Sequence, residues 1–85
     1  MTETVFVDTN VLVYARDASE VEKQPKAEEW LRHLWRERTG RLSFQVLQEF
    51  YVTVTGKLDP GMEPGAARDD VRSLLAWGPI SMNQR

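Results

Sequence analysis

The sequence predicts an α/β domain in which short buried strands alternate with helices around a parallel sheet. Residues 5–7 are apolar and β-prone, and they run without a break into the acidic Asp8. Such unbroken apolar runs are typical of strands that are buried on both faces of a parallel sheet. A second short run, residues 42–44, is separated from the first by segments with helical spacing. The alternation of strand and helix patterns therefore favours the α/β class.

The composition is that of one folded domain. The 85 residues are 28% charged and 41% hydrophobic, which argues against disorder. Cysteine is absent, so disulfides and thiolate metal sites are excluded. The longest apolar stretch, residues 11–15, is too short for a membrane span, and we expect a cytoplasmic protein that does not bind membranes. The net charge of −2 shows no general basic excess, so RNA binding would depend on a local patch or on metal ions.

The first two predicted helices differ in length. Residues 11–15 form the core of a short helix, and Pro25 suits the first turn of a longer one. The apolar residues of the second helix recur at helical spacing and are Ala27, Trp30, Leu31, Leu34 and Trp35. Gly40 is a plausible stop for this helix. We expect Trp30 and Trp35 to pack in the core rather than to form a base-stacking surface.

The predicted second strand, residues 42–44, leads into a third helix that begins at Ser43 or Gln45 and ends near Gly56. Residues 50–55 also have a strand-like composition, but helical spacing of the apolar positions favours a helix. These positions are Val46, Leu47, Phe50, Tyr51 and Val54. A fourth amphipathic helix follows and is closed by Gly78 and Pro79. Its apolar residues are Ala67, Val71, Leu74 and Leu75, and residues 80–82 could start a third strand.

Two acidic residues follow the two predicted strands. Asp8 would stand at the carboxyl edge of the sheet, where ligands of α/β proteins bind, although it could instead be a cap or turn residue. Glu49 lies about 140° from the centre of its helix's apolar stripe and can point into a cleft or simply into solvent. His33 lies among charged residues and is expected at the surface, so a histidine metal site or triad is not predicted.

Residues 5–15 and 42–51, at this separation, resemble the PIN domain, and most closely the VapC-like toxin ribonucleases of toxin–antitoxin modules. The resemblance implies a three-layer α/β/α sandwich around a parallel sheet, and a single PIN-like domain over residues 1–85. It also implies Mg²⁺- or Mn²⁺-dependent cleavage of RNA. Expected partners are an RNA substrate, an antitoxin protein and a second copy of the chain in a homodimer.

The resemblance assigns a role to each candidate site residue. Asp8 would be the main metal ligand and Glu49 a ligand that often acts through water. Thr9 and Asn10 would hold Asp8 and the start of the helix in place. Carboxylates suit this chemistry because Mg²⁺ and Mn²⁺ prefer oxygen ligands, and a carboxylate-held ion can activate water for attack on phosphorus.

The third and fourth acids of the family have no match in this sequence, which predicts a C-terminally truncated domain lacking a helix and a strand. Catalysis is expected to be impaired, because two carboxylates leave Mg²⁺ mostly bound to water. Asp69 and Asp70 are expected to be solvated helix charges rather than substitutes for the missing acids. A non-catalytic fragment that binds an antitoxin-like helix is one alternative. A haloacid-dehalogenase-type phosphatase is a distant one, because that reaction needs a general acid where Asn10 stands.

Overall fold

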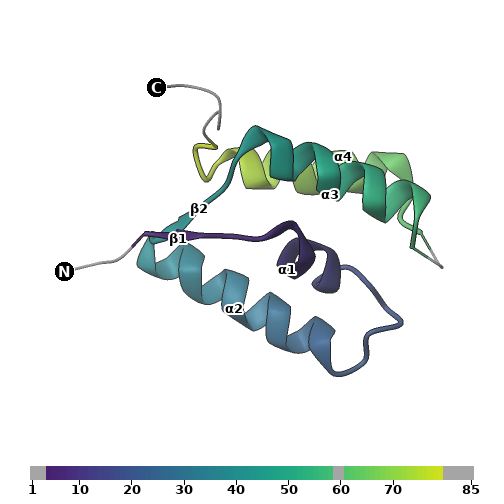
Figure 1. The fold of residues 1–85 in the computed structure, drawn as a ribbon, viewed down its shortest axis with the longest axis horizontal. Coiled ribbons are helices and arrows are strands. Elements are labelled where there is room, and N and C mark those ends of the chain that lie inside the picture. The colour runs from purple at the N-terminus through teal and green to yellow at the C-terminus, as the bar shows by residue number, and fades with distance from the viewer. Residues whose placement is uncertain (1–3, 59–60, 80–85) are drawn as a thin grey trace.

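A computed structural model describes residues 4–58 and 61–79 of the chain (Figure 1). The elements are β1 (Val5–Phe6), α1 (Thr9–Tyr14), α2 (Lys23–Glu37), β2 (Gly40–Arg41), α3 (Phe44–Gly56) and α4 (Pro64–Leu75). The structure is mostly helical with one small sheet, so the predicted mixed α/β class is confirmed. The possible third strand at residues 80–82 lies outside the described residues.

The two strands pair in parallel, as the apolar runs predicted. Val5 is opposite Gly40 and Phe6 is opposite Arg41. The pairing is extended at its far end by the backbone N–H of Val7, which donates to the carbonyl of Arg41 at 2.9 Å. The second strand lies two residues earlier than predicted, because Leu42 packs into the core and Ser43 already caps the next helix.

Helix α1 lies at the centre of the fold, in contact with α2 on one side and α3 on the other, and α4 packs against α3 (Figure 1). Its buried residues Leu12 and Val13 belong to one continuous core. The other core residues are Val7, Leu34, Leu42, Leu47, Phe50, Val54 and Ala67.

Within residues 4–58 and 61–79, no helix combines the length and the apolar character needed to cross a bilayer.

Helix α2 begins before Pro25, which sits in its first turn as predicted, but its end differs from the prediction. Arg38, not Gly40, adopts the left-handed conformation that closes the helix, with a φ of 58°. Gly40 instead belongs to β2, where a Cβ atom would overlap the six-membered ring of Trp77. The interpretation of Gly40 as the helix stop was therefore wrong, because a close contact with Trp77 requires glycine at this position.

The prediction that Trp30 and Trp35 pack in the core was also wrong. Their exposed fractions are 44% and 52%, respectively. Ala27 and Leu34 are buried and Leu31 packs against the core, so these three residues form the inward face of α2. At 100° per residue, the two tryptophans lie about 70° to either side of that face and remain in solvent.

Helices α3 and α4 form where they were predicted, but Leu75 of α4 is 45% exposed and does not join Ala67, Val71 and Leu74 at the core. Ser43 is the N-cap of α3, and its hydroxyl accepts a hydrogen bond from the Val46 N–H at 3.1 Å. Residues 50–55 are helical, so the strand alternative is excluded for this segment. Helix α4 starts at Pro64, and Gly78 takes a φ of 69° after the helix ends, as expected of a terminating glycine.

Candidate functional site

Asp8 occupies the N-cap position of α1, directly after the β1 segment. Its backbone is extended, with φ −75° and ψ 147°, and its side chain accepts no hydrogen bond from the helix. The side chain is exposed. Asp8 is therefore a cap by position only, and the carboxylate stays open to a ligand at the carboxyl edge of the sheet.

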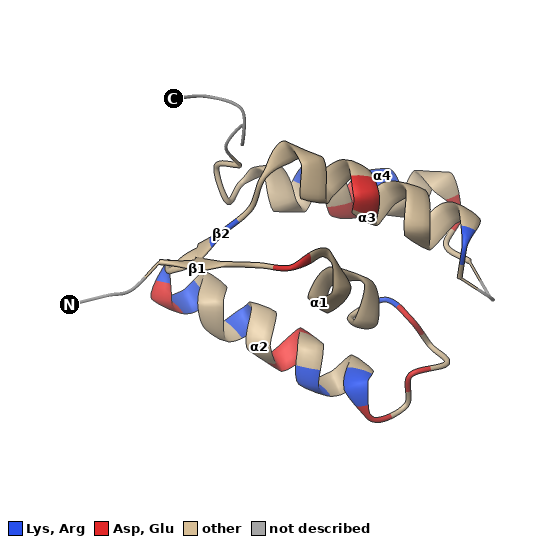
Figure 2. Ribbon diagram, in the orientation of Figure 1, with Lys and Arg blue, Asp and Glu red and all other residues tan. Residues whose placement is uncertain are grey.

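Glu49 lies on the exposed side of α3, as its position relative to the apolar stripe predicted. The hydroxyl of Thr9 donates a hydrogen bond to Glu49 Oε1 at 2.8 Å. This contact joins the two sequence motifs at one place, because α1 follows β1 and α3 follows β2 from the same edge of the parallel pair. Figure 2 shows acidic positions both at the β1–α1 junction and on α3.

We call Asp8, Thr9, Asn10 and Glu49 the acidic edge. All of its side chains can offer oxygen atoms, the ligand type that Mg²⁺ and Mn²⁺ prefer. Thr9 occupies one oxygen of Glu49 and so fixes the orientation of that carboxylate. Asn10 is exposed at the start of α1, next to the bonded Thr9.

Among the described residues, the acidic edge holds two carboxylates. Within residues 4–58 and 61–79, no group of three or more histidine, cysteine, aspartate or glutamate residues is placed to hold a metal ion. A divalent ion at Asp8 and Glu49 would therefore keep most of its water ligands and bind weakly. The residues fit a hard cation in donor type, while tight binding needs further acidic ligands.

Asp70 differs from its predicted role as a solvated charge. The Nε and Nη2 atoms of Arg16 both donate to its carboxylate, and the Asp70 side chain is only 18% exposed. Arg16 also approaches Glu28 at 3.6 Å, so it connects the end of α1 with α2 and α4. Asp69 is solvated as predicted, with a side chain that is 74% exposed. Because Arg16 follows α1 and Asp8 precedes it, Asp70 is not part of the acidic edge.

A second group of exposed residues was missed by the sequence interpretation. Trp35 lies close to Arg36, Arg38 and Arg41, and Trp30, one to two turns earlier on α2, lies close to Arg36 and Lys26. The interleaving of tryptophan and arginine between residues 30 and 41 was the sign that could have revealed it, and it was overlooked because both tryptophans were assigned to the core. His33 is exposed, as predicted, and its ring stacks on Trp30.

No protein-family model, curated protein or solved structure matches this chain. The likeness to the PIN domain therefore remains a prediction from the two sequence motifs. What the geometry adds is the contact between those motifs, since Thr9 and Glu49 are 40 positions apart in sequence.

Proposed function

We propose that the acidic edge binds Mg²⁺ or Mn²⁺ and that the protein is a metal-dependent endoribonuclease of the PIN type, a VapC-like toxin of a toxin–antitoxin module. The observation that supports the proposal most directly is the 2.8 Å hydrogen bond from Thr9 to Glu49. It brings the first-strand and second-strand motifs together at the edge where α/β proteins bind their ligands. In this proposal the fold is a three-layer α/β/α sandwich in which Asp8 and Glu49 take the places of the family's first two acids.

Each residue of the acidic edge has a separate role in this proposal. Asp8 offers a carboxylate that no helix N–H engages, and it is the main ligand. Glu49 is the second ligand, acting directly or through water, and Thr9 holds its carboxylate in one orientation. Asn10, exposed at the start of α1, would offer a further polar group to the ligand. When bound by these residues, Mg²⁺ or Mn²⁺ would supply activation of a water and neutralisation of negative charge on the phosphoryl oxygens.

The proposal also predicts that this pair of acids is insufficient by itself. Two carboxylates concentrate divalent ions poorly, so efficient cleavage requires further acidic ligands, which a second chain can supply. We expect the isolated 85-residue chain to cleave structured RNA slowly or not at all in Mg²⁺ or Mn²⁺. Robust cleavage that is abolished in Asp8→Asn would show that two carboxylates suffice.

Metal binding can be tested separately by Mn²⁺ titration of isotope-labelled protein, because the paramagnetic ion broadens the NMR signals of nearby amides. The amides of Asp8, Thr9 and Glu49 should broaden first, and Asp8→Asn or Glu49→Gln should remove this preference. Asp69→Asn is the matched control, since its side chain is 74% exposed and lies on α4. Equal broadening around Asp8 and Asp69 would contradict a metal site at the acidic edge.

A second candidate function is supported by an apolar hollow between α3 and α4. Phe44, Val52 and Leu75 line it, and each is 45% exposed or more. A hollow of this kind suits the apolar face of an amphipathic helix, so a non-catalytic role in binding an antitoxin-like partner is the alternative proposal. Co-purification with the product of an adjacent gene should then be abolished in Val52→Asp but retained in Asp8→Asn. Loss of the partner from both variants would contradict this role, and so would its retention by both.

A further inference from the structure

The outer face of α2 and the start of β2 carry two adjoining surface hollows that share Arg36. The first lies beside Trp30 and His33, and the second lies between Trp35 and Trp77. We call the cationic side chains and the α2 tryptophans of their lining the basic-aromatic surface. Its members are Lys26, Trp30, Trp35, Arg36 and Arg38, which are exposed, and Arg41, which is partly buried. Its last part, at Arg38 and Arg41, reaches the start of β2 and so the amino edge of the sheet, while Lys26 lies in the first turn of α2.

The two exposed tryptophans are both supported by a second ring. Trp30 stacks on His33, with ring centroids 5.5 Å apart and an interplanar angle of 13°. Trp35 lies against Trp77 at a centroid distance of 5.5 Å and an angle of 35°. Supported rings are already ordered before a ligand arrives, which lowers the entropic cost of stacking on them. Large apolar rings that stay half-exposed and ordered are well suited to accept a planar ligand.

The charge of the basic-aromatic surface is opposite to that of the whole chain. The two hollows are lined by four cationic side chains and one acidic one, Glu29, whereas the protein carries a net charge of −2. Within residues 4–58 and 61–79, none of these four cations forms an ion pair, in contrast to Arg16, Lys23 and Arg72.

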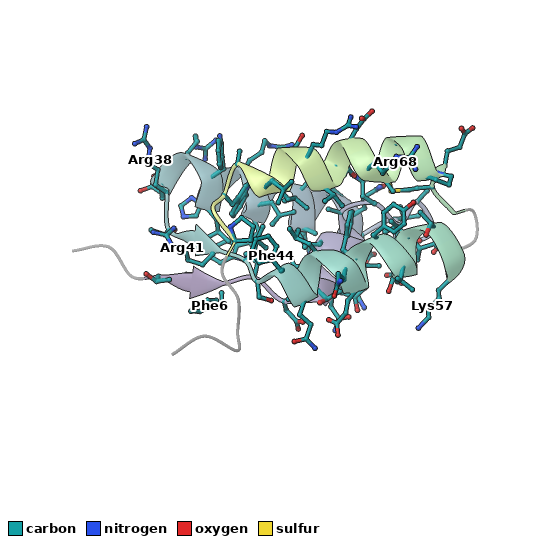
Figure 3. All side chains as sticks on the ribbon, turned by 90° about the horizontal axis from the view of Figure 1, so that it is seen from above. Phe6, Arg38, Arg41, Phe44, Lys57 and Arg68 are labelled. Carbon is teal, nitrogen blue, oxygen red and sulfur yellow. The ribbon has the colours of Figure 1, made fainter. Side chains whose placement is uncertain are left out.

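Arg41 is also held in position, because its Nη1 donates to the carbonyls of Gly40 at 2.9 Å and Arg38 at 3.3 Å. The remaining nitrogens of its guanidinium can still contact an anion. Figure 3 shows Arg38 and Arg41 together at one end of the molecule, far from Arg68 and Lys57. Positive charge is thus concentrated beside the tryptophans.

We propose that the basic-aromatic surface binds single-stranded nucleic acid. Bases stack on Trp30 and Trp35, and the backbone crosses the outer face of α2 at Arg36, with Arg38 and Arg41 beside the phosphates. Aromatic platforms combined with a cationic track are the general solution for binding single strands without reading their sequence. A patch of charge alone would not need the rings, and a core-packing role would not leave them half-exposed. The site does not include the acidic edge, so it can be tested independently of the proposed ribonuclease activity.

The test is fluorescence anisotropy with labelled oligouridylate and oligothymidylate of about 12 nucleotides, a length within the usual range of single-strand sites. Binding is measured in EDTA, which removes any contribution from metal ions. Both oligonucleotides should bind, because stacking and phosphate contacts are common to RNA and DNA, and affinity should fall as salt rises. Trp30→Ala should weaken binding by about fivefold or more. Arg36→Glu should weaken it and make the salt dependence shallower by about 0.7 in log–log slope for each phosphate that the protein no longer neutralises.

The matched control is Arg68→Glu, which makes the same change of charge on α4 at the opposite end of the molecule (Figure 3). It should bind as the unmodified protein does. Circular dichroism of each variant establishes that the helix content of the protein is retained. The proposal is overturned if neither oligonucleotide binds at low salt, if Trp30→Ala and Arg36→Glu bind normally, or if Arg68→Glu is as weak as Arg36→Glu. An acidic protein that binds this surface while both oligonucleotides fail to bind would likewise overturn it.

Discussion

Replacing Arg16 with methionine removes the guanidinium that joins the end of α1 to α4, while keeping an unbranched apolar stem. The change should be made alone and together with Asp70→Asn, and compared with Asp70→Asn by itself. This double-mutant cycle isolates the coupling free energy between the two side chains. Unfolding by denaturant or heat, followed by circular dichroism, supplies the four free energies.

The magnitude follows from the geometry of the pair. Arg16 donates twice to Asp70, and the side chains are 44% and 18% exposed, respectively. Hydrogen bonds to charged groups contribute about 1.5–3 kcal/mol, whereas fully exposed ion pairs contribute about 0.2–1 kcal/mol. For this half-buried pair we expect a coupling of about 1–2 kcal/mol. In a domain of this size, each kcal/mol shifts the melting temperature by roughly 4–8 °C.

The chain contains its own control for this cycle. Arg72 and Asp69 form an ion pair at 3.1 Å within α4, and both side chains are 74% exposed. The same cycle with Arg72→Met and Asp69→Asn should give about 0.5 kcal/mol or less. A coupling for Arg16 and Asp70 no larger than that of the exposed pair would refute the claim that partial burial strengthens it.

Three further substitutions test the packing. Gly40→Ala should destabilise the fold by about 1–3 kcal/mol in denaturant unfolding and shift tryptophan emission, because the added methyl overlaps Trp77; unchanged stability and emission would contradict that contact. Ser43→Ala should lower the free energy of unfolding by about 1 kcal/mol, because it removes the hydrogen bond from the Val46 N–H. Ser43→Asp should restore most of this stability, whereas equal destabilisation in both variants would argue against capping. Phe50→Ala removes a ring that is 1% exposed and should cost about 3–5 kcal/mol, so a melting transition close to that of the parent protein would be incompatible with its burial.

The helices could be predicted from the sequence because their determinants are local. The spacing of apolar residues predicted the inward faces of α3 and α4 apart from Leu75, which is 45% exposed. Ser43 and Gly78 mark the start of α3 and the end of α4, respectively. These features depend on residues within a few positions of each other. The same applies to the exposed position of Glu49, which follows from its angle on α3.

The end of α2 and the exact position of β2 could not be predicted in this way. Glycine after a helix usually indicates a stop, but Gly40 is required by its contact with Trp77, which is remote in sequence. Arg38 takes the left-handed conformation instead. Leu42 was predicted to lie in the strand, but β2 ends at Arg41 and Leu42 is instead buried in the core. Each of these outcomes depends on tertiary contacts rather than on local preference.

The candidate site shows the same division. The parallel strands predicted that the Asp8 and Glu49 motifs would meet at one edge, and the Thr9 hydrogen bond brings these motifs into contact. That Thr9 would bond Glu49, rather than support Asp8, depends on how α1 packs against α3 and has no local sign. Asp70 was assigned to solvent because its partner Arg16 lies 54 positions away. On α2 the apolar spacing predicts which face is buried but not how far the burial extends around the helix, so it does not predict that Trp30 and Trp35 are exposed.

The short parallel pairing of β1 and β2 has a consequence for the order of folding. It consists of two opposed residue pairs, and these join segments separated by the whole of α1 and α2. Closing so long a loop costs entropy that two pairs cannot offset until the intervening helices have formed and packed. The pairing of β1 with β2 should therefore form after the rate-limiting step of folding. Substitutions at Val5 should then accelerate unfolding while leaving the refolding rate nearly unchanged.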